Sequence, residues 1–184
     1  ESGFREYMNQ LDTPLETGYL LRIGIDHFKE INDNFGQEYG DFVLKKTAEC
    51  ISGCTSEGQK VYKLVADEFL IPDVSSDEVK DADKLYDKVR EAIDRFIETN
   101  EFKVMYTVSG GIVPFAALKG NQCSEALKLT DFALNEAKKL GRNRCYIFNG
   151  ETYRKFLRKR EITQELREAV INGFQGFTAF YQPV

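Results

Sequence analysis

The stretch KLVADEFLIP, residues 63–72, has the pattern of a strand, a tight reversal and a second strand. Two adjacent carboxylates, Asp67 and Glu68, stand at the reversal between apolar runs. Tight hairpin turns favour glycine or asparagine because they need positive φ angles, yet Val65 and Ala66 precede the acids here. Three interpretations are therefore open: a working acidic site, the remains of one, or an ordinary solvated turn.

Strand and helix patterns alternate on both sides of this hairpin. Apolar runs or alternating residues predict strands at 18–25, 61–65, 68–71, 102–114 and 144–148. Apolar residues at helical spacing predict helices from about residue 41, at 79–97, at 124–140 and at 151–172. Residues 1–17 are polar without clear periodicity and are interpreted as an N-terminal extension. The order predicts an α/β domain whose helices cover a mixed or mainly antiparallel sheet.

The composition argues against several classes of protein. A net charge of −5 and a pI of about 5.1 give no support for a nucleic-acid-binding face. Because no apolar run is long enough to span a membrane and no secretory signal is present, we expect a cytoplasmic location. We expect no membrane contact by this segment, while membrane attachment of the full-length protein stays open. Residue 1 is not methionine, so we interpret the sequence as part of a longer protein.

The four cysteines accompany a single histidine and form no CxxC pair. A zinc site normally needs four such ligands at short spacings. We therefore expect reduced thiols rather than a metal centre.

Four pieces of sequence occur in order along the chain: DHFKEINDNFGQEYGDFVL (26–44), ADEF (66–69), SGGI (109–112) and AKKLGRNR (137–144). Together they resemble a GGDEF domain, the domain of bacterial diguanylate cyclases. The resemblance implies a degenerate GGDEF domain over residues 18–150. Its expected fold is that of nucleotidyl cyclases and polymerase palms, with a central, mainly antiparallel sheet flanked by helices.

The end of the chain carries a second, shorter resemblance. LREAVINGFQGFTAFYQPV (166–184) is similar to the opening of an EAL domain, the family that hydrolyses cyclic di-GMP. This resemblance implies a GGDEF–EAL tandem protein. In such a protein residues 151–172 form a connecting helix and residues 173–184 begin a truncated EAL domain.

The chemistry of the GGDEF family joins two GTP molecules into cyclic di-GMP with the help of Mg²⁺ or Mn²⁺. The resemblance implies Asp67 and Glu68 as remnants of the catalytic turn. It also implies Asp67 and the backbone of Ile25 as metal ligands. Gly24 stands where the family has a metal-binding aspartate, and the two residues before Asp67 are not the family's glycines. We therefore expect impaired catalysis.

Nucleotide-binding positions are better matched. The resemblance implies that Asn32 and Asp41 bond the guanine edge, that Lys138 and Arg142 contact phosphates, and that Lys29 also contacts the nucleotide. Each of these residue types is also common in purely structural roles. Asparagine and aspartate cap helices, and cations are favoured near a helix C-terminus. Both interpretations stay open at this point.

Three hypotheses follow for function. The first is a catalytically impaired module that binds GTP, or nothing, and regulates an attached EAL phosphodiesterase. The second is an active diguanylate cyclase with an altered metal site. The third is a purely structural or dimerising domain, in which case a homodimer is the expected partner. The expected cofactor depends on which hypothesis holds, since Mg²⁺ or Mn²⁺ is expected only if a nucleotide binds.

Overall fold

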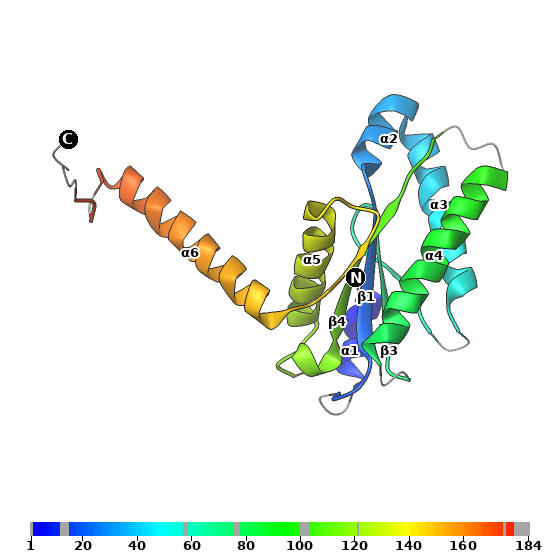
Figure 1. The fold of residues 1–184 in the computed structure, drawn as a ribbon, viewed down its shortest axis with the longest axis horizontal. Coiled ribbons are helices and arrows are strands. Elements are labelled where there is room, and N and C mark those ends of the chain that lie inside the picture. The colour runs from blue at the N-terminus through cyan, green and yellow to red at the C-terminus, as the bar shows by residue number, and fades with distance from the viewer. Residues whose placement is uncertain are drawn as a thin grey trace. The chain divides into compact units, whose positions relative to one another are not determined.

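A five-stranded mixed sheet forms the centre of the first of two compact units, Glu1–Phe148 (Figure 1). The computed structural model describes residues 2–11, 15–56, 59–75, 78–99, 104–120, 122–174 and 176–178. The strand order is β2–β3–β1–β4–β5, with β1 antiparallel to β3 and β4, and β4 parallel to β5. The strands are β1 Tyr19–Ile25, β2 Tyr62–Lys63, β3 Glu68–Asp73, β4 Val108–Pro114 and β5 Cys145–Ile147. The predicted α/β fold with a helix-flanked sheet is confirmed.

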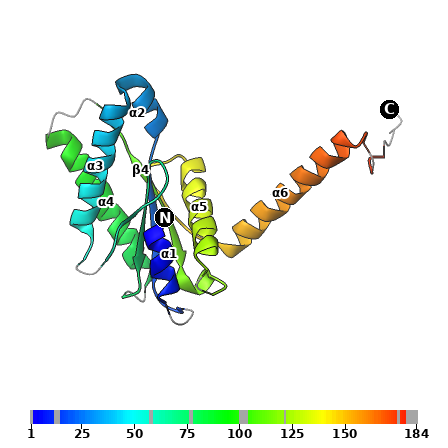
Figure 2. The same ribbon diagram turned by 180° about the vertical axis from the view of Figure 1, so that it is seen from behind.

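Helices cover both faces of this sheet (Figures 1 and 2). Helices α3 (Gln37–Cys54) and α4 (Val79–Thr99) lie on one side, and α5 (Cys123–Lys139) lies on the other. Successive residues of a strand point to opposite faces. In β1, Leu21 and Ile23 therefore enter the core with α3 and α4, whereas Arg22 and Gly24 face α5. Helix α2 (Phe28–Phe35) packs beside α3, and a short 3-10 helix follows β4 at Phe115–Ala117.

The glycines of SGGI allow close packing in this structure. A Cβ atom on Gly111 would lie 2.4 Å from the backbone nitrogen of Leu134 in α5. A Cβ atom on Gly110 would lie 2.7 Å from the ring of Tyr86 in α4. Because real Cβ atoms are not found so close to other heavy atoms, both glycines let a helix approach β4.

Two elements differ from the sequence-based expectation. Helix α1 (Ser2–Asn9) forms where no element was expected, and its Phe4 and Met8 are fully buried. The Phe4 ring lies 5.6 Å from the Tyr62 ring of β2, so α1 contributes to the packing of this unit. The strand expected from residue 102 begins only at Val108, which pairs with the last residue of β1. Residues 104–107 form no strand, and Phe102 lies outside the described residues.

The second compact unit, Asn149–Val184, contains helix α6 (Gly150–Ile171). The Asn149 side chain accepts hydrogen bonds from the backbone nitrogens of Glu151 and Thr152, both at 3.0 Å, and so caps the first turn. The helix agrees with the one expected at 151–172, but its role as a connector stays a prediction. Of the expected EAL segment, residues 175 and 179–184 lie outside the described residues.

Two further expectations concern composition. The four cysteines are free thiols, Cys123 buried and the other three half-buried. No helix within the described ranges combines the length and the apolar character needed to cross a membrane.

Candidate active site

The acidic turn and the end of β1 lie side by side, as the resemblance implies. Gly24 pairs with Glu68 of β3 on one side and with Ser109 of β4 on the other. The backbone nitrogen of Ile25 donates to the carbonyl of Asp67 at 3.3 Å. The sheet register therefore places the predicted metal-binding positions at one end of the central strands.

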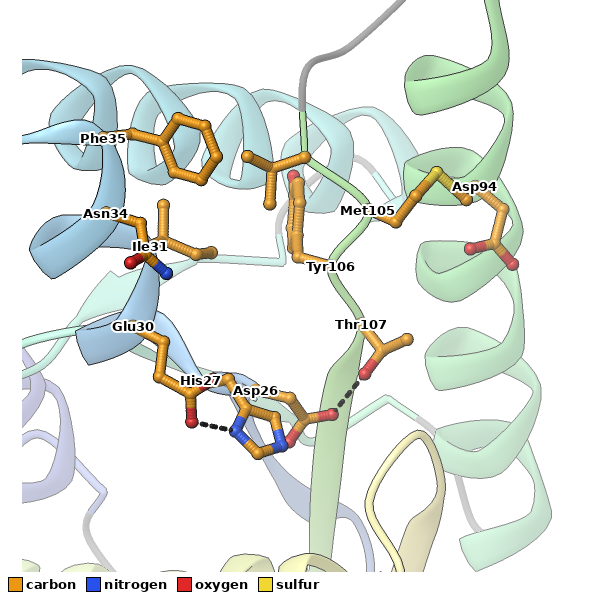
Figure 3. A pocket seen from close by; sticks show the side chains of 11 residues that line it. Asp26, His27, Glu30, Ile31, Asn34, Phe35, Asp94, Met105, Tyr106 and Thr107 are labelled. Carbon is orange, nitrogen blue, oxygen red and sulfur yellow. Dashed lines mark hydrogen bonds and ion pairs between the residues drawn. The ribbon is translucent and has the colours of Figure 1, made fainter.

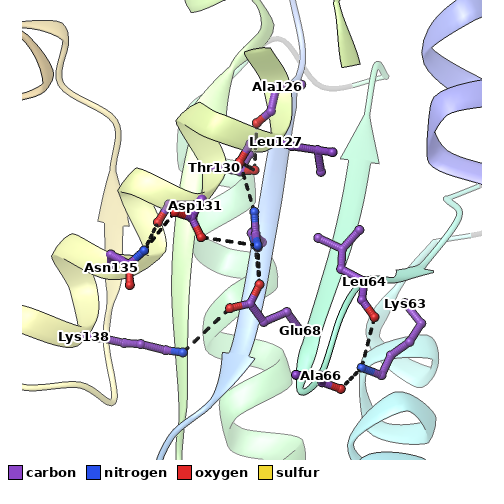
Figure 4. A network of polar contacts seen from close by, with 11 residues as sticks. Lys63, Leu64, Ala66, Glu68, Ala126, Leu127, Thr130, Asp131, Asn135 and Lys138 are labelled. Carbon is purple, nitrogen blue, oxygen red and sulfur yellow. Dashed lines mark hydrogen bonds and ion pairs between the residues drawn. The ribbon is translucent and has the colours of Figure 1, made fainter. Parts of the chain in front are cut away.

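The carboxylate of Glu68 is held by two cationic side chains (Figure 4). Arg22 donates to its Oε2 atom from Nε at 2.7 Å and also from Nη2. The Nζ atom of Lys138 lies 4.0 Å from Oε1. Only 18% of the Glu68 side chain and 12% of the Arg22 side chain are exposed. The predicted catalytic residue Glu68 thus forms a half-buried ion pair with Arg22.

Arg22 was not singled out in the sequence, although a signal was present. It is the one charged residue in the apolar run GYLLRIGI, residues 18–25. Its guanidinium also donates to the carbonyl of Leu127 at 3.0 Å and lies 3.5 Å from Asp131. Arg22 therefore links β1, β3 and α5 in one polar cluster.

The turn itself keeps a glycine-like backbone without glycine. Ala66 has a φ angle of 57°, in the left-handed region that costs an L-residue about 1–2 kcal/mol. Lys63 donates to the carbonyl oxygens of Ala66 and Leu64, the latter at 3.4 Å. Val65 is 73% exposed. Side chains therefore stand where the family has bare backbone.

The predicted metal ligands do not form a complete carboxylate site. Gly24 supplies no carboxylate, and Glu68 is engaged by cations. Asp67 remains as a half-buried carboxylate at the turn. Across the described residues, no three histidine, cysteine, aspartate or glutamate side chains are grouped to hold a metal ion. The residues present do not fit a Mg²⁺ site of the expected kind.

The guanine candidates lie on adjacent helices. Asn32 is inside α2 and Asp41 is inside α3, so the alternative that they cap helices is wrong. The Oδ1 atom of Asn32 lies 1.8 Å from the position that a Cβ on Gly40 would occupy. The Asn32 amide therefore lies against α3 at Gly40, the residue that precedes Asp41. Asp41 itself is exposed.

Of the three basic residues predicted to contact the nucleotide, only Lys138 is shown to reach the acidic turn. Lys138 is in the last turn of α5 and reaches the Glu68 carboxylate. Arg142 follows that helix with a φ angle of 61° and is exposed. Lys29 is exposed on α2. The position of Lys138 and Arg142 at a helix C-terminus agrees with the dipole interpretation as well as with phosphate binding.

Asp26 is a buried carboxylate whose hydrogen-bond donors all come from the protein itself. The residue is 3% exposed, and its carboxylate accepts hydrogen bonds from Thr107 Oγ1 and Ser109 Oγ, each at 2.7 Å. The backbone nitrogen of Asn143 donates to it at 3.2 Å. Asp26 therefore ties the end of β1 to β4 and to the loop after α5.

A pocket of about 280 Å³ opens beside Asp26 (Figure 3). Its walls include His27 and Phe35 from the α2 region and Met105 and Tyr106 from the segment before β4. Burial raises the pKa of Tyr106 to about 12. Neither the predicted nucleotide-binding residues nor Asp67 and Glu68 line this pocket.

Comparison with known proteins identifies the family. The chain belongs to the GGDEF family, because residues 2–144 match the family described as "Diguanylate cyclase, GGDEF domain". It is therefore a GGDEF domain of cyclic di-GMP signalling.

The relatives of this chain include proteins named as a cyclic di-GMP phosphodiesterase and as a probable diguanylate cyclase. "Cyclic di-GMP phosphodiesterase NbdA" of Pseudomonas aeruginosa is 28% identical over 166 residues, which cover 90% of this chain and 21% of NbdA. "Probable diguanylate cyclase DgcT" of Escherichia coli is 30% identical over 152 residues, 78% of this chain and 32% of DgcT. A solved EAL/GGDEF domain protein from M. capsulatus superposes with a TM-score of 0.62 at 27% identity, covering 72% of this chain and 86% of that one. The chain thus spans about a fifth and a third of the two curated relatives.

Proposed function

We propose that this GGDEF domain is impaired as a cyclase and serves as a GTP-binding regulatory module of a longer protein. One observation carries the proposal: Gly24 stands beside a Glu68 carboxylate that Arg22 already binds. A cyclase needs carboxylates free to hold metal near the reacting hydroxyl and phosphate. Here one carboxylate is missing and another is paired.

Retention of the guanine candidates supports GTP as the ligand. Asn32 and Asp41 do not cap helices, so helix capping does not explain them. An amide offers both a donor and an acceptor, and a carboxylate accepts from the two N–H groups of the guanine edge. ATP lacks that edge, so we expect selective binding of GTP.

The regulated partner in this proposal is an attached EAL domain that follows α6. The similarity to NbdA, whose name gives it a phosphodiesterase activity, supports this partner. GTP would act by binding two arrangements of the longer protein unequally, since a ligand shifts an equilibrium only through differential affinity.

Calorimetric titration with GTP, using ATP as control, tests binding. Chromatography of the same mixtures tests for cyclic di-GMP. We expect GTP-selective heat without product, and we expect Asn32→Ala and Asp41→Ala to remove that heat. Asp33→Ala, on the exposed side of α2, is the matched control and should bind normally. Cyclic di-GMP in the product would establish the cyclase alternative, and no heat would establish the structural one.

A restoration experiment tests whether the changes at positions 24, 65 and 66 alone account for the loss of metal and GTP contacts, or whether the GTP site has also changed elsewhere. The triple variant Gly24→Asp, Val65→Gly and Ala66→Gly returns the family's residues to the metal site and turn. If only these groups were lost, the variant should gain metal-dependent GTP contacts. A folded triple variant without GTP binding would show that the pocket has changed elsewhere.

A further inference from the structure

The ammonium group of Lys138 lies inside the cluster where the family resemblance places a metal. Its Nζ atom is 4.0 Å from Glu68 Oε1 (Figure 4). The same atom is 3.2 Å from the point that a Cβ on residue 24 would occupy. The Lys138 side chain is 24% exposed, so it is half-buried and keeps a path to solvent. A fixed cation therefore stands beside Gly24.

The charges around Lys138 disfavour a second cation. Arg22 and Lys138 are positive, while Glu68 and the more exposed Asp131 are negative, so the charges of these four side chains sum to zero. A divalent metal prefers several anionic oxygen ligands. Here it would meet two cations, the Glu68 carboxylate that both of them approach, and Asp67 as the remaining carboxylate of the turn. An aspartate at position 24 would add one negative charge and would place a carboxylate next to the lysine.

We propose that Lys138 replaces the divalent metal in this chain, so that the acidic turn and the end of β1 bind the triphosphate of GTP without Mg²⁺. This inference rests on the proposed GTP-binding function. An ammonium group forms short, charge-assisted hydrogen bonds with phosphate oxygens. Mg²⁺ neutralises the same oxygens, so metal-free GTP presents more negative charge to Lys138 than the metal complex does.

The first test is calorimetric titration of the chain with GTP in excess EDTA and again in millimolar Mg²⁺. We expect GTP to bind in EDTA at least as tightly as in Mg²⁺. The dissociation constant in EDTA should equal the value in Mg²⁺ or be lower by up to about threefold. Binding only in Mg²⁺ would overturn the metal-replacement inference while leaving the GTP-binding function intact. No binding under either condition, by protein with a native circular-dichroism spectrum, would overturn both.

Two variants locate the effect at Lys138. Lys138→Gln should weaken binding in EDTA by about tenfold or more, because one charge-assisted contact is lost. Lys139→Gln is the matched control, since Lys139 pairs with Glu136 at 2.6 Å on the outer side of the same helix turn. Equal losses in the two variants would contradict a specific role for Lys138.

Gly24→Asp tests the same idea by gain of function. The new carboxylate would pair with Lys138 and create an oxygen ligand for metal. Its built Cβ is 3.1 Å from Leu134 Cδ2, a flexible side-chain end that has room to adjust. GTP binding by this variant should weaken in EDTA and recover in Mg²⁺. Unchanged, metal-independent binding would refute the proposed exchange of lysine for metal.

Discussion

The ion pair between Arg22 and Glu68 should contribute measurably to stability. The Nε atom of Arg22 lies 2.7 Å from Glu68 Oε2, and the two side chains are 12% and 18% exposed. Exposed pairs contribute about 0.2–1 kcal/mol, whereas removing one partner of a fully buried pair costs about 3–5 kcal/mol. A half-buried pair with two bonds to one oxygen falls between these limits. We expect a coupling energy of about 2 kcal/mol.

A double-mutant cycle with Arg22→Met and Glu68→Gln measures that coupling. Urea unfolding at pH 7 gives the free energy of each variant, provided that the slopes agree. Each single variant should melt roughly 4–8 °C lower, as expected for a loss of about 2 kcal/mol in a domain of this size. Lys84 and Asp81 form the control pair, 2.7 Å apart with 69% and 44% exposure.

The control pair should show a coupling below about 0.5 kcal/mol, because solvent screens it. A coupling of that small size for Arg22 and Glu68 would refute the reasoning. Glu68 would then be a free carboxylate, and the main support for impaired catalysis would be lost.

Three further predictions concern the backbone and pH. Ala66→Gly should relieve left-handed strain and raise the free energy of unfolding by about 0.5–1 kcal/mol in urea titrations. Gly111→Ala should lower the melting temperature strongly because its Cβ would meet α5 backbone, whereas Gly53→Ala, with open space around it, should stabilise α3 by about 0.5 kcal/mol. Burial raises the pKa of Asp73, but hydrogen bonds from neighbouring groups lower it to below its ordinary 3.8. Its stabilising effect is thus present above pH 3.8 and lost as pH falls through the folded pKa, so Asp73→Asn should lose less stability than wild type in acid melts.

Most of the fold was predictable because it depends on local pattern. A mostly apolar run predicted β1, alternation predicted the strand that contains β4, and helical spacing predicted α4 and α5. The start of β4 was misplaced because a strand needs a partner: β1 ends at Ile25, opposite Val108, and a backbone hydrogen bond from Asp26 to Thr107 follows without further strand pairing in the described residues. Helix α1 was missed because only Phe4 and Met8 mark its buried face in so short a segment.

The candidate site was less predictable because its contacts join distant residues. Arg22 and Glu68 are 46 residues apart, and only the β1–β3 register brings them together. The sequence showed that Gly24 lacks a carboxylate, but not that Lys138 lies beside it. Charge pairing of this kind depends on which face of a strand meets which turn of a helix.

The environment of Asp26 gives this residue a role in folding that does not depend on any reaction. Two hydroxyl groups and one backbone amide would lose their acceptor if this carboxylate were removed. Folding alone would then preserve the aspartate through any loss of activity. An aspartate at this position of a GGDEF sequence is therefore no evidence of catalysis by itself, because its hydrogen bonds already explain its presence.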